Sequence, residues 1–162
     1  MVRFLVQWIS GIIVLTDNFF FYPIVSIFMP KISEKKKQVP VVVKRSSAGL
    51  GLFATVPIKK GATIIEYIGE RVPTSVGDER DNRYMFNVNT KWDIDGSPRY
   101  NTARYANHAC RPNSDAINRR GRIFIVAKKN IDALEEITYH YGKDHFEGFI
   151  KPLGCRCSKC RS

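Results

Sequence analysis

Hydrophobic residues follow two different patterns, which divide the chain near residue 39. In residues 4–29 they form one long run whose single charged residue is Asp17, and lysines follow from Lys31 onward. Beyond residue 39 they occur in short β-branched stretches between glycine, asparagine and charged residues. Short stretches with this spacing are typical of strands joined by turns. The sequence therefore predicts a mainly β protein of several small sheets.

Local patterns predict individual strands and a small amount of helix. Strands are expected at residues 39–44, 62–67 and 122–128. A hairpin is expected where residues 89–91, Asn-Thr-Lys, separate the stretches 84–88 and 92–94. Helical pattern is confined to residues 102–107 and 144–149. Several small sheets with few short helices are the architecture that these stretches imply.

The apolar run near the N-terminus has two interpretations. About twenty apolar residues can span a bilayer, and the lysines that follow would leave the rest of the chain in the cytoplasm. Thr16-Asp17-Asn18 and Pro23 break the run into short pieces, however, and no small-x-small cleavage site precedes the lysines. If Met29 is the true start, the run is a spurious extension. Residues 1–38 are therefore predicted to be either a spurious leader or a membrane anchor, and contact with a membrane is expected only if residues 4–29 are a real anchor.

Composition and charge fit an intracellular globular domain. The chain has 162 residues, of which 44% are hydrophobic and 25% charged, and its four cysteines are too few for a secreted disulfide scaffold. The net charge is +11, and residues 1–38 carry +3 of it, so +8 belongs to the remainder. This excess attracts acidic surfaces. No arginine-rich helix or aromatic RNA-binding motif accompanies it, so no direct sequence-specific nucleic-acid binding is expected. The predicted location is cytoplasmic, or nuclear and with chromatin if the protein is eukaryotic or is delivered to a host cell.

The four cysteines are candidates for one metal site. Cys155, Cys157 and Cys160 form a C-x-C-x2-C cluster at the C-terminus, and Cys110 lies far upstream. Three thiolates in a tight knuckle plus one from elsewhere suit tetrahedral zinc, and a site closed by four thiolates is structural. The alternative is that Cys110 is a small buried hydrophobic residue and that the tail cysteines are free thiols or pair with each other.

Five sequence patches in a fixed order carry a specific signal. They are GLGLFA at 49–54, EYIGE at 66–70, RYANHACRPN at 104–113, EEITYHYG at 135–142, and the cysteine tail. With this set the chain resembles the SET-domain protein lysine methyltransferases, and its tail resembles their post-SET zinc knuckle. The similarity covers about residues 39–162. It implies a SET catalytic domain at residues 39–142 and a post-SET zinc-binding tail at 143–162.

The resemblance also implies a fold and a reaction. In the family, several small β-sheets surround a C-terminal pseudoknot, in which the segment after Asn-His-x-Cys threads under a loop. The methyl donor is S-adenosylmethionine and the acceptor is a lysine side chain of a protein, here a histone or a similar basic protein. The four cysteines would hold a structural zinc ion. The alternative is a catalytically silent SET-like module that binds a protein partner.

Individual roles follow from the same resemblance. Tyr141 would lie at the reacting centre, and Tyr139 occupies the phenylalanine/tyrosine switch position, where a hydroxyl implies mainly monomethylation. Tyr67 and Phe86 would form walls of the lysine channel, with an ordinary place in the strand core as the alternative. The residues that would contact the donor or support its pocket are Ala48, Gly49, Leu50, Gly51, Tyr84, Arg104, Asn107 and His108.

Two positions depart from the family pattern. His140 stands between the two tyrosines, where the family usually has aspartate. Leu153 stands where an aromatic residue commonly precedes the knuckle and stacks on adenine. Either Phe146 or Phe149 supplies that aromatic face instead, or the affinity for the donor is weaker.

Overall fold

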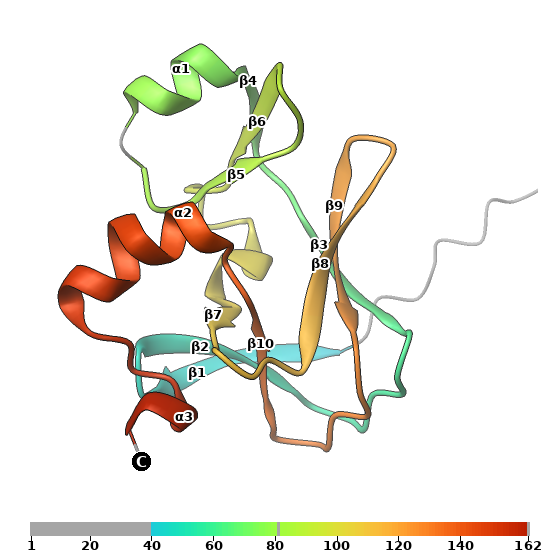
Figure 1. The fold of residues 1–162 in the computed structure, drawn as a ribbon. Helices are drawn as coiled ribbons and strands as arrows, with labels where there is room; N and C mark the ends of the chain where they lie inside the picture. Colours follow the sequence, from blue (N-terminus) through green and yellow to red (C-terminus); the bar gives the residue numbers. More distant parts are fainter. Residues whose placement is uncertain (1–39, 81, 162) are drawn as a thin grey trace, which may run out of the picture. The chain divides into compact units, whose positions relative to one another are not determined.

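Short strands make up most of the regular structure. The structure, a computed structural model, describes residues 40–80 and 82–161 (Figure 1). Its strands are β1 (Val41–Ser46), β2 (Gly49–Ala54), β3 (Thr63–Tyr67), β4 (Glu70–Pro73), β5 (Met85–Asn87), β6 (Trp92–Asp95), β7 (Asn107–His108), β8 (Ser114–Arg119), β9 (Arg122–Ala127) and β10 (Glu136–Tyr139). Its helices are α1 (Thr74–Glu79), η1 (Thr102–Tyr105), α2 (Lys143–His145), η2 (Phe146–Ile150), η3 (Lys151–Leu153) and α3 (Ser158–Arg161). The predicted mainly β class is confirmed.

The strands of the described residues form three small sheets, with the orders β1-β2-β10-β7, β3-β9-β8 and β4-β6-β5. The first sheet joins segments that are distant in the sequence. Its strand β10 pairs antiparallel with β2 and parallel with β7, where Thr138 lies opposite Asn107 and Tyr139 opposite His108. The sheet therefore brings three of the five sequence patches side by side.

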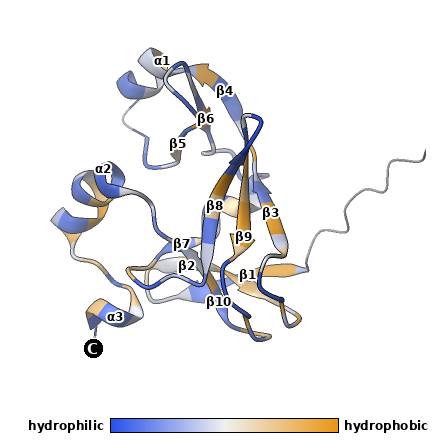
Figure 2. Cartoon of the chain, turned by 45° about the vertical axis from the view of Figure 1, so that its right-hand side comes forward, coloured by the Kyte–Doolittle hydropathy of each residue, from blue (hydrophilic) through white to orange (hydrophobic). Residues whose placement is uncertain are grey.

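Aliphatic side chains from all three sheets form the core. In β9 alternate residues, Ile123, Ile125 and Ala127, are buried, as expected for a strand with one face turned inward. They pack in one cluster with Leu52 of β2 and Ile137 of β10. Figure 2 shows the hydrophobic colouring concentrated on β1, β3 and β9, while the hairpin tips are hydrophilic. Burial of each such side chain contributes about 1.5–3 kcal/mol.

Most of the strand predictions agree with the structure. Predicted strands 39–44, 62–67 and 122–128 correspond to β1, β3 and β9. The predicted hairpin is formed by β5 and β6, which pair antiparallel. Its turn is held by Asn89, whose Oδ1 accepts the backbone N–H groups of Lys91 at 2.9 Å and Trp92 at 3.0 Å.

Both helix predictions need correction at their ends. The 3-10 helix η1 ends at Tyr105, because Asn107 and His108 pair with β10 and are extended. In the second predicted helix, at residues 144–149, the structure has three helices, α2, η2 and η3, that follow one another without a break. Helical backbone therefore continues beyond residue 149 to Leu153. Strands β2, β4, β7, β8 and β10 and the helices α1 and α3 were not predicted.

Two predictions stay untested, the leader at residues 1–38 and the threading of the pseudoknot. The leader at residues 1–38 is outside the described residues. Within residues 40–80 and 82–161, no helix has the length and apolar character needed to cross a bilayer. The threading of the pseudoknot stays a prediction.

Candidate active site

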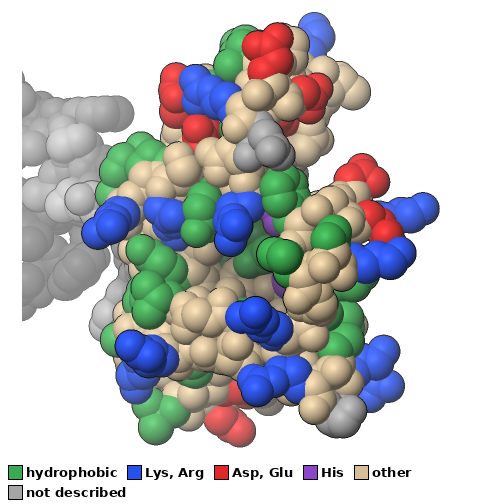
Figure 3. Space-filling view, turned by 90° about the vertical axis from the view of Figure 1, so that its left-hand side faces the viewer, with side chains coloured by type: hydrophobic (Ala, Val, Ile, Leu, Met, Phe, Trp, Pro, Cys, Tyr) green, Lys and Arg blue, Asp and Glu red, His purple; other side chains and the backbone are tan. Residues whose placement is uncertain are grey.

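A cavity of about 780 Å³ lies where the ends of β2, β7 and β10 meet the C-terminal helices. Its lining includes ten of the twelve predicted catalytic, donor and channel residues: Ala48, Leu50, Tyr67, Tyr84, Phe86, Arg104, Asn107, His108, Tyr139 and Tyr141. Gly49 and Gly51 are not among the described residues that line it. Figure 3 shows a hollow with hydrophobic and histidine side chains at its floor and lysine and arginine side chains around it.

Tyr141 places a phenol at the floor of the cavity. Its Oη donates a hydrogen bond of 2.9 Å to the backbone carbonyl of Ala106. Because the hydroxyl proton is used there, the oxygen lone pairs remain for whatever enters the cavity. Burial raises the pKa of Tyr141, with further contributions from Tyr84 and Glu136, so the phenol stays neutral. A neutral, fixed phenol can orient a reactant but is not a base.

Tyr139 lies next to Tyr141, with ring centroids 4.8 Å apart. Its side chain is buried, and burial raises its pKa well above 10. Among the described residues its hydroxyl has no hydrogen-bond partner, and it is not a fully enclosed polar atom. The Tyr139 hydroxyl is therefore available to a group in the cavity.

A row of aromatic rings continues from these two tyrosines. Phe86 lies 6.4 Å from Tyr139 and 5.3 Å from Tyr67, measured between ring centroids. The Tyr67 hydroxyl donates to the backbone carbonyl of Tyr84 at 2.7 Å. Gly96 makes room for this ring, because a Cβ there would lie 2.3 Å from it. Tyr67, Phe86 and Tyr139 all line the cavity, so this part of its surface is aromatic and largely apolar.

His108 connects the cysteine cluster to the backbone of Tyr141. Its Nδ1 accepts the Tyr141 N–H at 3.3 Å, and its Nε2 lies 3.6 Å from the Sγ of Cys110. An Nδ1 that accepts leaves the ring proton on Nε2, where it can be donated to sulfur. Burial, together with His140 and His145, lowers the pKa of His108 to about 4, which keeps the ring neutral. These contacts are compatible with a structural role for the His108 ring, which stays a prediction.

Asn107, the neighbour of His108 in β7, also lines the cavity. Its Nδ2 donates to the carbonyl of Leu50 at 3.0 Å and to Oε1 of Glu136 at 2.7 Å. The other oxygen of Glu136 accepts from Ser46 Oγ at 2.7 Å. Gly51 is required beside this carboxylate, because a Cβ there would lie 2.3 Å from Oε1. Sequence reasoning gave no role to Glu136, although it lies in the patch at 135–142, or to Ser46, because their contacts depend on the pairing of β2 with β10 and β1.

Arg104 and Tyr84 support the cavity as a stacked pair. The guanidinium carbon of Arg104 lies 3.8 Å from the centroid of the Tyr84 ring. The Arg104 side chain also donates to the carbonyl of Ser97, while its Nε is buried without a partner among the described residues. The prediction left open whether Arg104 was a surface charge, and the structure places it in the cavity lining.

The C-terminal helices cover one side of the cavity. Phe149 lines it and packs on His145, with ring centroids 4.8 Å apart. Phe146 instead packs against His108 at 5.2 Å and is not among the described lining residues. Leu153 also lines the cavity and is 72% exposed. Of the two candidates for the missing aromatic face, Phe149 is the one in position.

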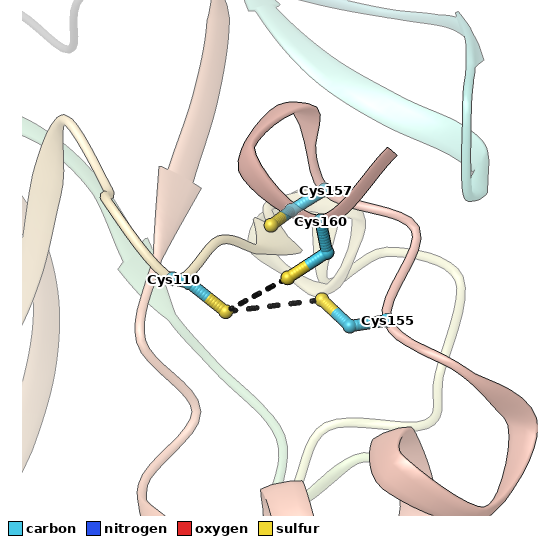
Figure 4. A group of neighbouring side chains, drawn as sticks. All are labelled: Cys110, Cys155, Cys157 and Cys160. Atoms are coloured by element: carbon cyan, nitrogen blue, oxygen red, sulfur yellow. Dashed lines mark hydrogen bonds between the residues drawn. The ribbon is translucent and has the colours of Figure 1, made fainter. Parts of the chain in front are cut away.

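The four cysteines meet in one cluster (Figure 4). Their sulfur atoms all lie within 4.8 Å of one another, and Cys110 Sγ is 3.9 Å from that of Cys155 and 3.6 Å from that of Cys160. A tetrahedron with Zn–S bonds of about 2.3 Å has edges of about 3.8 Å, so the arrangement fits a four-thiolate zinc ion. None of the four forms a disulfide. Neither paired tail cysteines nor a Cys110 isolated in the core agrees with this geometry.

Protonation in the cluster is uneven. Burial and the adjacent thiols raise the pKa of Cys110 to about 12. Burial also acts to raise that of Cys157, but backbone N–H and thiol donors outweigh it and lower the value to about 6. Four thiolates this close repel one another unless a cation lies between them, so a metal ion would displace the remaining protons.

Comparison with known proteins identifies the class. The SET domain family model matches residues 49–142, more than half of the chain, and the chain therefore belongs to the SET domain family. SET methyltransferases use S-adenosylmethionine. Four of the five sequence patches lie within the residues that this family model matches, and the cysteine tail follows them.

Individual relatives are histone-lysine N-methyltransferases by name. The chain is 40% identical over 124 residues to the histone-lysine N-methyltransferase set1 of Dictyostelium discoideum. The aligned region covers 68% of this chain and 8% of that protein. It is 35% identical over 136 residues to an enzyme of Saccharomyces cerevisiae named as H3 lysine-4 specific, covering 75% of this chain and 13% of that protein. The chain thus corresponds to a small part of each relative.

A solved structure shows the same fold. The match is a humanized mutant of the Chaetomium thermophilum Polycomb Repressive Complex 2 bound to an inhibitor, with a TM-score of 0.59 and 33% identity. It covers 65% of this chain and 15% of that one. The SET-like arrangement of small sheets expected from the sequence is therefore confirmed.

Proposed function

We propose that this protein transfers a methyl group from S-adenosylmethionine to the ε-amine of a lysine in a protein substrate. The observation that supports this most strongly is the cavity in which Tyr139 and Tyr141 lie beside the Asn107-His108 strand and under the cysteine-bearing tail. A module that only bound a partner would have no need to keep both tyrosine hydroxyls available beside an aromatic channel.

The chemistry explains what the residues of the site contribute. The donor supplies a methyl group on a sulfonium, and transfer to an amine is an in-line displacement that needs alignment and exclusion of water. Holding two reactants in line is worth about 7–11 kcal/mol. The lysine must also be neutral, which for a pKa of ~10.4 costs about 4.6 kcal/mol at pH 7. The desolvated wall of Tyr67, Phe86 and Tyr139 favours the neutral amine, and aromatic faces attract the donor cation.

Donor and metal sites follow from the same arrangement. We assign donor contacts to Ala48, Leu50, Asn107 and the backbone of His108, with Phe149 as the aromatic face for adenine. Tyr84 and Arg104 support the pocket. The four cysteines would hold a structural zinc ion, which fixes residues 143–161 over the cavity. We retain the division into a catalytic domain at 39–142 and a zinc-binding tail at 143–162 as part of this proposal.

A histone is the substrate we propose. The relatives are named as histone-lysine methyltransferases, and several as H3 lysine-4 specific. A histone substrate would place the protein with chromatin. The positive charge around the cavity mouth does not attract a basic tail, so the affinity for the substrate must come from the channel and from backbone contacts.

The proposal is tested with the full chain, zinc and labelled S-adenosylmethionine. Calorimetry should show one donor molecule bound per chain, and label should appear on lysine in histone H3. Whole-cell lysate offered as a second substrate, followed by mass spectrometry, identifies the modified lysine. Zinc-loaded protein that binds no donor would overturn the proposal in favour of a catalytically silent binding module.

Tyr139→Phe should shift the product from mainly monomethyl-lysine toward di- and trimethyl-lysine. The available hydroxyl of Tyr139 can hold the amine or a channel water, and its removal leaves room for added methyl groups. Mass spectrometry of a substrate peptide at equal turnover measures the shift. Tyr100→Phe, the same change at an exposed residue that is not among the described lining residues of this cavity, is the control and should leave the product unchanged. An unaltered product distribution in Tyr139→Phe would remove the switch assignment.

A further inference from the structure

We infer that Glu136 is the positioning residue of the methyl-donor site, because it fixes the Asn107 side-chain amide in one orientation. The inference rests on the proposed function. Glu136 is not among the described residues that line the cavity. Its carboxylate lies beside Gly51 of β2 and contacts Asn107.

The orientation of the amide is determined by chemistry. Asn107 Nδ2 lies 3.0 Å from the carbonyl oxygen of Leu50 and 2.7 Å from a carboxylate oxygen of Glu136. Both partners only accept hydrogen bonds, so the amide atom between them must be the NH2 group. With the amide flipped, Oδ1 would face two oxygens at hydrogen-bond distance. The pair Leu50 and Glu136 therefore excludes the flipped state.

The fixed amide leaves Oδ1 as the group that Asn107 can offer to the cavity. Within the described part of the chain this oxygen has no hydrogen-bond partner, and it is not fully enclosed. An oxygen in this position accepts from a donor and repels a carboxylate. The methionine part of the methyl donor carries both an ammonium and a carboxylate, so the orientation of Asn107 selects which of the two lies beside it.

Glu136 is itself held in place. Its second oxygen accepts from Ser46 Oγ at 2.7 Å, so the β1–β2 hairpin fixes the carboxylate from the other side. Gly51 provides the space, since a Cβ there would lie 2.3 Å from Oε1 of Glu136. Gly51 thus has a reason to be glycine that does not require direct contact with the donor.

Glu136→Ala should raise the dissociation constant for S-adenosylmethionine by roughly tenfold or more, because Asn107 can then flip. The rate at saturating donor should change little, so the effect appears in KM and not in kcat. Glu136→Gln should retain near wild-type affinity. Its Oε1 can accept from Asn107 while its NH2 donates to the Ser46 hydroxyl, which accepts instead of donating. Glu135→Ala is the matched control, because that carboxylate contacts Asn113 and Lys129 instead.

A double-mutant cycle separates positioning from a loss of stability. In an Asn107→Ala background, Glu136→Ala should have no further effect on donor affinity by calorimetry, since there is no amide left to orient. A loss that persists in the Asn107→Ala background would overturn the inference, as would unchanged affinity in Glu136→Ala. Wild-type protein that bound no donor would overturn the proposed function and this inference together.

Discussion

Tyr141→Phe should reduce the rate of methyl transfer by about 10²–10³-fold or more while donor affinity stays close to the wild-type value. The Tyr141 hydroxyl donates its proton to the Ala106 carbonyl at 2.9 Å, so its lone pairs are directed by a bond that exists before any reactant arrives. Phenylalanine keeps the ring and its packing against Tyr139 but removes that oriented acceptor. Initial rates with labelled donor and calorimetric binding measure the two quantities separately.

Tyr100→Phe is the matched control for this experiment. Tyr100 is 65% exposed and does not belong to the described residues that line the catalytic cavity. The same chemical change there should leave both turnover and donor binding unaltered. Near wild-type turnover in Tyr141→Phe would contradict the central role of this phenol, and loss of donor binding would instead show that its hydroxyl supports the pocket.

The side chains of the site could be predicted because their chemical identity is visible in the sequence. Cysteine, tyrosine and asparagine at fixed spacing specify a zinc knuckle, a pair of phenols and a pocket polar group without any knowledge of the sheets. The structure brings all four cysteines into one cluster, and ten of the twelve other residues line one cavity. Whether each performs its predicted role stays a prediction.

The pairing of strands that are distant in the sequence could not be predicted from the sequence. β7 has only two residues, and its parallel pairing with β10 has no local pattern. β8 reads Ser-Asp-Ala-Ile-Asn-Arg, which is largely polar because several of its side chains face solvent. The effect of Glu136 on Asn107 depends on both pairings of β10, and it could not be found before they were known.

Tertiary packing can also require a residue that makes a helix hard to predict from its local sequence. The helix α1, Thr-Ser-Val-Gly-Asp-Glu, contains a glycine that disfavours helix by about 1 kcal/mol. This glycine, Gly77, is buried against β6, and a Cβ there would lie 2.3 Å from a carboxylate oxygen of Asp93. The close approach of Asp93 therefore requires glycine at position 77, and this same glycine makes the sequence of α1 resemble a loop.

Cys110→Ser should abolish zinc binding and, with it, most of the affinity for the methyl donor. Four-thiolate sites lose much of their affinity when one thiolate is removed, and structural zinc in small domains is worth about 10–16 kcal/mol of binding free energy. The tail from residue 143 contributes much of the cavity wall, including Phe149 and Leu153. Cys110 Sγ also lies 3.6 Å from His108, whose ring holds the Tyr141 N–H. The variant therefore removes the cover of the cavity and a support of the reacting phenol together.

The β core should survive this substitution, because its buried aliphatic cluster is built from the sheets and contains none of the four cysteines. Metal analysis should fall from one zinc per chain to near zero, and donor affinity should fall at least roughly tenfold, about 1.4 kcal/mol. The β signal in circular dichroism should remain. Ser158→Ala, within the tail but not a ligand, is the control. A chelator should reproduce the loss in wild type, and added zinc should restore donor binding there but not in Cys110→Ser. Full zinc content in Cys110→Ser would show that Cys110 is not a ligand, and unchanged donor affinity without zinc would show that the cluster does not hold the tail over the cavity.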